Sequence, residues 1–264
     1  MPNSMRRADL LVQPDLQPYL SRLSGAGSLR RELEAVLDVA PVQTELEQYR
    51  KLILEMNAAG KRSASMRLWT WKRLKVRYLL NPMVPEFRAF RWAIASTNDP
   101  GERGLLALLM MARTDRLFRE VVSEHVSPFL RQPGSVVDEL HVSSAVDRIA
   151  QVVKARWTRS VVDGLTSHIL SASKDYGLLK GNAARRTVQI RPGLGTVALI
   201  VRFSRLEGLS DRRTLDSRWF RLLGMNLVDV LDLMHRAARQ GALRFQFQAD
   251  LAEIELPELQ EAFR

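Results

Sequence analysis

Short stretches with the apolar periodicity of an α-helix follow one another along this 264-residue chain, and glycine or proline ends several of them. In residues 42–57, for example, Leu46, Tyr49, Ile53 and Met56 fall on one side of a helix, and Gly60 follows. Each such helix must bury its apolar stripe against a neighbour. Helices are therefore predicted over 29–39, 42–57, 63–80, 86–96, 102–111, 116–125, 144–155, 160–173, 197–206 and 227–240.

Two segments alternate apolar and polar residues instead, as strands do. Val188 and Ile190 alternate inside GLLKGNAARRTVQIRP, and residues 243–247 and 252–256 alternate near the end of the chain. A first helix with Ser144 and Asp147 in capping-box spacing, a tight turn, a second helix and a basic hairpin are the outline of a winged helix-turn-helix. The expected fold class is mainly α with short β-hairpins, a helical bundle plus winged helix-turn-helix elements.

Gln132-Pro133-Gly134 marks a break between two halves of the chain. We expect a loose arm over 1–40, an N-terminal helical domain with a basic helix-turn-helix over 41–131, and a C-terminal winged-helix domain with a terminal β-hairpin over 135–264.

The composition excludes several protein classes. The chain has no cysteine, which rules out disulfides and thiolate metal sites and fits a reducing compartment. The first residues, MPNSMRRADLLVQPDLQPYL, do not resemble a signal peptide. The longest apolar run, from Leu105 to Ala112, is much shorter than the ~20 residues that span a bilayer. We therefore expect a cytoplasmic protein with no membrane partner.

The net charge of +11 is concentrated in two blocks. Residues 60–91 contain nine basic residues and one acidic residue, and residues 148–221 contain fifteen basic and five acidic residues. Two basic blocks in an otherwise near-neutral chain indicate a polyanionic partner more strongly than the overall charge does.

The first block contains GKRSASMRLWTWKRLKVRYLL, residues 60–80, which has seven Lys or Arg and no acid. A helical wheel gives this stretch two apolar seams, Met66, Trp69, Val76 and Leu80 in one and Trp71, Leu74 and Tyr78 in the other. A membrane-surface helix has one apolar and one cationic face, so two seams argue against it. A solvated bundle face is an alternative, but such faces usually interleave acids with bases. We expect nucleic-acid contacts from Lys61, Arg62, Arg67, Lys72 and Arg73.

The second block surrounds the predicted helix 160–173. Opposite its buried side lie short polar residues, including Ser167 and Ser171, and no arginine or asparagine that could contact a base edge bidentately. The predicted contacts are therefore mostly to phosphates. They are assigned to Arg156, Arg159, Ser167, Ser171, Lys174, Lys180, Arg185 and Arg186. The alternative is that the serines permit close packing against another helix.

No catalytic residue, metal site or cofactor is predicted. The four histidines stand in no metal-ligand spacing, and no carboxylate pair stands out. The segment beginning at Gly193 matches GxGxxA, but the second strand and the acid of a dinucleotide fold do not follow it.

Three segments together resemble the BrxA family of BREX bacteriophage-defence systems. They are NAAGKRSASMRLWTWKRLKVRYLL, LLALLMMARTDRLFREVVSEHV, and RWTRSVVDGLTSHILSASKDYGLLKG with its RRTVQIRP, and the resemblance covers about 57–192. It implies a mostly helical protein with helix-turn-helix or winged-helix elements that binds DNA and has no assigned catalytic activity. Residues 217–256 extend beyond the length of the shorter members of the family.

The sequence therefore predicts a non-catalytic DNA-binding component of a BREX-type defence system. It would grip the backbone of double-stranded DNA through two basic surfaces with little sequence preference, and other BREX subunits are its expected partners. Two alternatives stay open: an RNA-binding protein, and an interaction scaffold whose basic faces dock acidic partner proteins.

Overall fold

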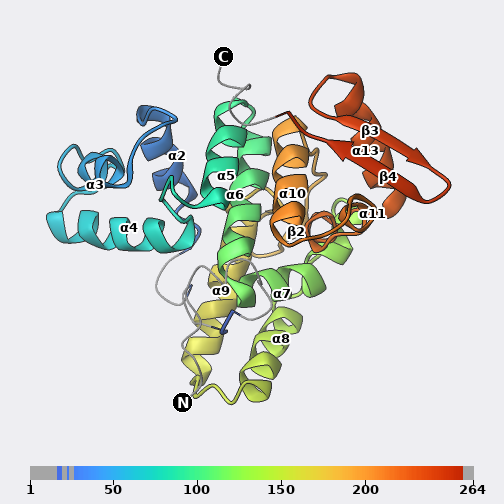
Figure 1. Cartoon of the computed structure of the whole chain (residues 1–264). Helices are drawn as coiled ribbons and strands as arrows, with labels where there is room; N and C mark the ends of the chain where they lie inside the picture. The colour runs from blue at the N-terminus through green and yellow to red at the C-terminus, as the bar shows by residue number, and fades with distance from the viewer. Residues whose placement is uncertain (1–16, 20–22, 24–26, 258–264) are drawn as a thin grey trace, which may run out of the picture.

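The computed structural model describes residues 17–19, 23 and 27–257, and its fold is mainly helical (Figure 1). Most of the N-terminal segment that does not resemble a signal peptide, and most of the arm predicted over 1–40, lies outside the described residues. The helices of the first half are α2 (Arg30–Val39), α3 (Leu46–Leu54), α4 (Ala64–Arg77), α5 (Pro85–Ala95), α6 (Pro100–Thr114) and α7 (Arg116–His125).

The second half adds more helices and two short antiparallel strand pairs. The helices are η3 (Ser127–Arg131), α8 (Glu139–Val152), α9 (Arg159–Asp175), α10 (Leu194–Leu206), α11 (Asp211–Leu215), α12 (Arg218–Leu222) and α13 (Leu227–Arg239). The strands are β1 (Leu179–Lys180), β2 (Arg186–Thr187), β3 (Arg244–Gln248) and β4 (Leu251–Glu255). The predicted fold class, mainly α with short hairpins, is confirmed, while its winged helix-turn-helix interpretation stays a prediction.

The centre of the molecule is α6, with α5 and α10 packed beside it (Figure 1). Every residue from Leu105 to Ala112 is buried, as a helix that is apolar all round must be. The buried apolar side chains form one cluster that continues from α2 to β4, across the break predicted at Gln132-Pro133-Gly134. The domain boundaries themselves stay a prediction. Among the described residues, no helix is long and apolar enough to cross a membrane.

A charged group also lies inside this core. Arg113, at the end of α6, is fully buried and forms ion pairs with Glu86 of α5 at 2.9 Å and Glu207 after α10 at 2.5 Å. Its guanidinium also lies 5.5 Å from the ring of Phe203 and 5.8 Å from that of Trp219. Two carboxylates and two aromatic faces offset the cost of burying the charge, and they tie four helices to one side chain.

Most predicted helices are present, with shifted ends. Ser63 caps α4, because its Oγ accepts the N–H of Met66 at 3.2 Å. However, α4 ends at Arg77 rather than near Leu80, because Leu79 adopts a left-handed conformation with φ of 51°. The helix predicted over 42–57 is also shorter, since Glu45 forms the capping box that starts α3.

The capping box predicted for Ser144 and Asp147 is wrong. The helix α8 begins five residues earlier, where the carboxylate of Asp138 accepts the N–H of Leu140. Ser144 lies inside the helix, and its hydroxyl donates to the carbonyl of Leu140 at 2.8 Å. Asp is as strong an N-cap residue as Ser, so the sequence offers two possible starts for this helix, and the structure has the earlier one.

The strand predicted at Val188 and Ile190 is also wrong. The β1–β2 hairpin pairs Leu179 with Thr187 and Lys180 with Arg186, and it ends before Val188. Gly181 makes its turn with φ of +87°, and a Cβ there would lie 2.4 Å from the carbonyl oxygen of Ala184. The β3–β4 hairpin is confirmed, with Phe245 opposite Ile254 on its buried side.

The C-terminal ends of α4 and α9 meet at two buried tyrosines. The hydroxyls of Tyr78 and Tyr176 lie 2.7 Å apart, and the Tyr78 hydroxyl donates to the carbonyl of Ser28 at 2.6 Å. Since Tyr78 has one proton to give, Tyr176 is the donor in the bond between them. Burial raises the pKa of both phenols above the usual value. Both hydroxyls are therefore neutral, and they join two helices that are distant in sequence.

Candidate nucleic-acid interface

One side of α4 packs on the core. Trp71, Leu74 and Tyr78 are buried there, as the second apolar seam predicted. The first seam is buried only at Leu80, because Met66 is 44% exposed and Trp69 and Val76 are only half-buried. The helix is therefore anchored along one side and leaves a wide face for its cations.

The predicted cations on or next to this face are here called the α4 face: Lys61, Arg62, Arg67, Lys72 and Arg73. Arg62 and Lys72 are exposed, and neither has an ion-pair partner within the described residues. The guanidinium of Arg73 lies 5.4 Å from the ring of Trp69, which holds that side chain along the helix. Lys61, which is predicted to contact nucleic acid, has a carboxylate partner in the fold: its Nζ lies 2.5 Å from a carboxylate oxygen of Glu32.

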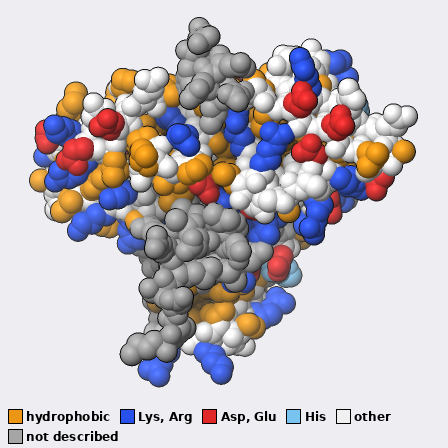
Figure 2. Space-filling model, viewed as in Figure 1, with side chains coloured by type: hydrophobic (Ala, Val, Ile, Leu, Met, Phe, Trp, Pro, Cys, Tyr) orange, Lys and Arg blue, Asp and Glu red, His pale blue; other side chains and the backbone are white. Residues whose placement is uncertain are grey.

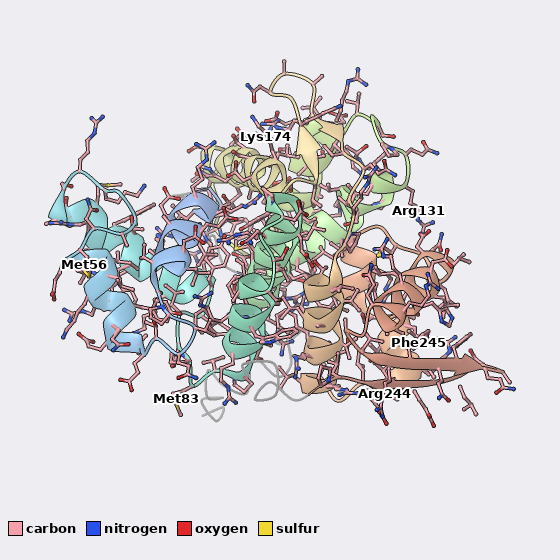
Figure 3. All side chains as sticks on the ribbon, turned by 90° about the horizontal axis from the view of Figure 1, so that it is seen from above. Met56, Met83, Arg131, Lys174, Arg244 and Phe245 are labelled. Atoms are coloured by element: carbon pink, nitrogen blue, oxygen red, sulfur yellow. The ribbon has the colours of Figure 1, made fainter. Side chains whose placement is uncertain are left out.

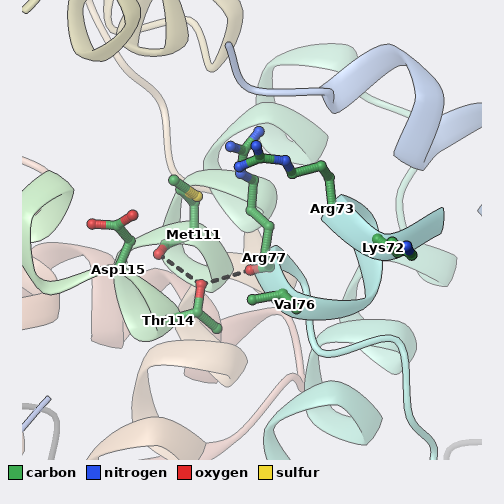
Figure 4. Close-up of a pocket in the computed structure, with 7 residues that line it drawn as sticks. All are labelled: Lys72, Arg73, Val76, Arg77, Met111, Thr114 and Asp115. Atoms are coloured by element: carbon green, nitrogen blue, oxygen red, sulfur yellow. Dashed lines mark hydrogen bonds between the residues drawn. The ribbon is translucent and has the colours of Figure 1, made fainter. Parts of the chain in front are cut away.

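Arg77, the last residue of α4, is buried, unlike the cations of the α4 face. Its guanidinium donates to the carbonyl of Gly27. Figure 4 shows the side chains of Arg73 and Arg77 extending to the same side of α4, above a small pocket between α4 and the end of α6. Thr114 closes that pocket by donating its hydroxyl to the carbonyls of Arg77 and Met111, at 2.6 and 3.1 Å. These bonds fix the end of α4 against α6.

The second predicted surface is built on α9, whose orientation agrees with the wheel. Val162, Leu165 and Ile169 are buried, whereas Ser167 and Ser171 are exposed. Among the described residues, the serines therefore face solvent and do not pack against another helix. Thr158 caps α9 by accepting the N–H of Val161.

The predicted residues of this second region are here called the α9 surface: Arg156, Arg159, Ser167, Ser171, Lys174, Lys180, Arg185 and Arg186. Several of its cations already have partners. Arg185 pairs with Glu139 at 2.5 Å, Arg159 pairs with Asp163 at 3.0 Å, and Lys174 donates to the side-chain oxygen of Asn182 at 2.5 Å.

The other cations of the α9 surface are less constrained. Arg186 donates to the carbonyl of Gly134 at 2.9 Å, which leaves its charge without a carboxylate. Arg156 and Lys180 are exposed and, in the part of the chain that the structure describes, have no ion-pair partner. Figure 2 shows Lys and Arg side chains gathered over α4 and at the lower tip of the molecule, near the turn between α8 and α9. Arg156 and Lys180 are thus the cations of this surface that are most available to a ligand.

The two surfaces are joined at one end. The Tyr78–Tyr176 bond brings together the ends of α4 and α9, and Lys174 lies two residues before Tyr176. Burial, followed by the positive charge of the nearby Arg77, lowers the pKa of His168 on α9. From that junction the helices point in different directions (Figure 1). The sequence suggested no such connection, because the two tyrosines are 98 residues apart.

Two of the four histidines contact each other. His125 Nδ1 lies 2.9 Å from His141 Nε2, which links the end of α7 to α8. Burial, followed by His141 and Arg148, lowers the pKa of His125. Across the described residues, no group of three or more His, Cys, Asp or Glu is placed to hold a metal ion.

The glycine motif has a structural explanation that excludes phosphate binding at that point. Glu102 of α6 places its carboxylate at the N-terminus of α10 and accepts the N–H of Thr196 at 3.0 Å. A Cβ at Gly193 would lie 2.3 Å from this carboxylate, and one at Gly195 would lie 3.1 Å from the carbonyl of Ala93. The glycines admit the chain's own carboxylate, which occupies the position where a phosphate would bind.

Four arginines that the sequence did not single out also face a common space. Arg131, Arg191, Arg236 and Arg239 line an open groove between the η3 segment, the loop after β2, and α13. They belong to no single charge run, since they are contributed by three segments. Only the i,i+3 spacing of Arg236 and Arg239 on an amphipathic helix would have indicated part of this set.

Comparison with known proteins agrees with the resemblance found in the sequence. The family model of BrxA matches residues 17–197, which is more than two thirds of the chain. No curated protein matches the chain.

Proposed function

The chain belongs to the BrxA family, and from this premise we propose that it is a non-catalytic, DNA-binding component of a BREX-type phage-defence system. Family membership suggests the BREX-associated role. The finer proposal is that the α4 face and the α9 surface grip the backbone of duplex DNA in the cytoplasm, and that other BREX subunits supply any chemistry.

The observation that carries this proposal is the presence of cations without carboxylate partners on both surfaces. Several buried or half-buried arginines do have carboxylate partners: Arg113 has two, and Arg30 and Arg116 each pair with a Glu one turn away. On the two surfaces, Arg62, Lys72, Arg156 and Lys180 have none among the described residues. A row of unmatched cations repels itself until an anion binds, and a phosphodiester backbone supplies anions at a regular spacing.

The exposed face of α9 favours contacts to phosphates over contacts to bases. It presents Ser167, Ser171 and Lys174, which bind phosphate oxygens well but do not discriminate base edges as a bidentate arginine or asparagine does. Affinity should therefore depend strongly on salt and weakly on DNA sequence.

The absence of catalysis is part of the proposal. Three features support it in the described part of the chain: no cluster of metal ligands, a histidine pair whose nitrogens bond to each other, and a glycine motif filled by Glu102. None of these arrangements leaves an activated nucleophile or an acid–base pair in a cleft.

Fluorescence anisotropy of a labelled random-sequence duplex, measured across a salt series, tests the proposal. Two double variants remove one pair of unmatched cations each, Arg62→Gln with Lys72→Gln and Arg156→Gln with Lys180→Gln. The control, Arg88→Gln with Arg244→Gln, removes the same charge from α5 and β3.

We expect the wild-type log K to fall linearly with log salt, and each test variant to reduce the slope by about 1.8, at about 0.9 per phosphate contact. The control should leave the slope unchanged. No binding of wild-type protein at low salt would overturn the DNA proposal and favour the protein scaffold. Tighter binding of a single-stranded RNA of equal length would favour the RNA alternative.

A further inference from the structure

The groove beside α13 has one wall from the segment that the family model matches and one wall from beyond it. Residues 130–133 and 189–192 form the first wall, and α13 with the turn before it forms the second. The groove has a volume of about 990 Å³. Its floor includes Leu130, Ile190 and Leu233, so it is not a purely polar depression.

Arginines dominate the charge of this groove. Arg131 donates from Nε to the carbonyl of Gly224 at 3.1 Å, and Arg236 donates to the carbonyl of Pro192 at 2.7 Å. Each of these bonds spans the groove, uses one of the five guanidinium donors, and holds the side chain in place without neutralising it. Arg191 and Arg239 are exposed, and none of the four has an ion-pair partner among the residues described.

Two acids also line the groove, and they limit where an anion can lie. Asp229 is engaged at the start of α13, where its carboxylate accepts the N–H of Asn226 at 3.1 Å. Asp232 is exposed and unpaired within the described chain. Both acids precede Arg236 and Arg239 on the helix, so an anionic chain fits best at the C-terminal part of α13, between its arginines and Arg191.

The groove adjoins the α9 surface. The segment that follows Arg131 is bonded to the β1–β2 hairpin: Gly134 donates its N–H to the carbonyl of Thr187 at 2.9 Å, and the Thr187 hydroxyl donates to the carbonyl of Gln132 at 2.8 Å. Figure 3 shows Arg131 at the edge of the molecule, between Lys174 and the β3–β4 hairpin. The arginines of the groove therefore continue the cationic surface that begins at Lys174 and Arg186.

From this arrangement we propose that the groove is an additional phosphate-binding site for duplex DNA, which extends the α9 surface onto the C-terminal part of the chain. The inference rests on the proposed function, because its ligand is the same duplex. Guanidinium groups suit this ligand, since their planar donors match phosphate oxygens in pairs. Their distribution over three segments suits a ligand with repeated anions better than one with a single anion.

The test compares three variants in the same anisotropy assay. Arg191→Gln with Arg239→Gln removes two exposed cations that have no side-chain hydrogen bond or ion pair among the described residues, and the salt slope should fall by about 1.8. Asp232→Asn removes a repelling carboxylate from the same groove and should raise the affinity. Arg88→Gln with Arg244→Gln is the matched control. Thermal unfolding of each variant verifies that the fold is unchanged.

The outcomes separate this inference from the proposed function. If the α4 pair, Arg62→Gln with Lys72→Gln, lowers the slope while the groove pair leaves both slope and affinity at the wild-type value, the groove is not a DNA site and the proposed function stands. If wild-type protein binds no duplex, both fail. If the groove pair weakens DNA binding and Asp232→Asn strengthens it, the site is supported, because loss of structure would not produce opposite effects.

Discussion

Arg113 and Lys72 carry the same charge in opposite surroundings. Arg113 lies in a dry core with carboxylates from Glu86 and Glu207 and two aromatic rings around it. Lys72 lies in water on α4 with no carboxylate partner in the described chain. Inside the fold, a charge without partners costs several kcal/mol, so its partners are built in. On the surface the same omission costs little. The difference shows which cations hold the fold together and which are left available to a ligand.

The largest expected effect is at the buried charge. Arg113→Ala removes the counter-charge of the buried Glu86 and one of the cationic partners of Glu207, which keeps Arg218 at 3.7 Å. It should lower the free energy of unfolding by about 3–5 kcal/mol in a urea titration. Arg88→Ala, on the exposed side of α5, is the control and should stay within about 0.5 kcal/mol. A loss below about 1 kcal/mol for Arg113→Ala would mean that the buried ion pairs of Arg113 contribute no more to stability than a surface arginine does.

A smaller effect is expected where Glu102 meets α10. Gly193→Ala places a Cβ against the Glu102 carboxylate and should destabilise the protein by about 1–3 kcal/mol. Gly164→Ala on α9 is a matched control, because nothing lies within 4 Å of its Cβ and alanine favours a helix by about 1 kcal/mol. Equal effects of the two substitutions would contradict the close packing at Gly193.

The pH dependence of stability extends the comparison to groups that are neutral in the fold. The pKa values of His125 and His168 are lowered by burial, so the unfolded chain binds protons first as pH falls. Their contribution to stability is present above the usual histidine pKa and is lost as pH falls through the lowered values. Urea titrations between pH 7.5 and pH 5 should show this decline as a fall in the free energy of unfolding, within the ~pH 5–8 range where histidines titrate. The variant with His125→Asn and His168→Asn should show a flatter curve, and an unchanged curve would assign the decline to other groups.

The smallest effect on stability is expected on the α4 face. Lys72→Gln should change the free energy of unfolding by less than about 0.5 kcal/mol. The same substitution should reduce the salt slope of DNA binding by about 0.9. If Lys72→Gln instead lowers stability strongly and leaves the salt slope of DNA binding unchanged, Lys72 is a structural residue and not a ligand contact.

Local patterns predicted most of the helices, because the information lies within a few residues. The cap at Ser63, the buried side of α9 and the β3–β4 hairpin all follow from spacing in the sequence. The errors arose where contacts outside the local stretch decide the structure, or where the local signal was too weak or had a competitor. Val188 lies in an alternating pattern typical of a strand. In the fold, however, its N–H donates to the carbonyl of Leu178, and the N–H of Thr187 donates to the carbonyl of Ser135. The short helices α11 and α12 were missed, because five residues carry too little periodicity.

The candidate site was predictable only as a list of cations. Sequence cannot tell that Arg62 is unpaired while Lys61 meets Glu32, because the partner lies 29 residues away. For the same reason it cannot tell that Arg77 reaches the carbonyl of Gly27 and is buried. The groove arginines come from segments more than 40 residues apart, and only the folded chain brings them together.

The hydroxyl bond between Tyr78 and Tyr176 also has a mechanical consequence. It pins the ends of α4 and α9 to each other, and the Tyr78 hydroxyl is fixed in turn to the backbone of Ser28. Rotation of one helix against the other would strand two phenols in a space that water does not reach, at a cost of about 1–3 kcal/mol for each unsatisfied group. The angle between the helices is thus a rigid dimension of the protein. A double helix that touches both must adjust its own curvature, and duplex DNA resists such bending over a persistence length of about 50 nm.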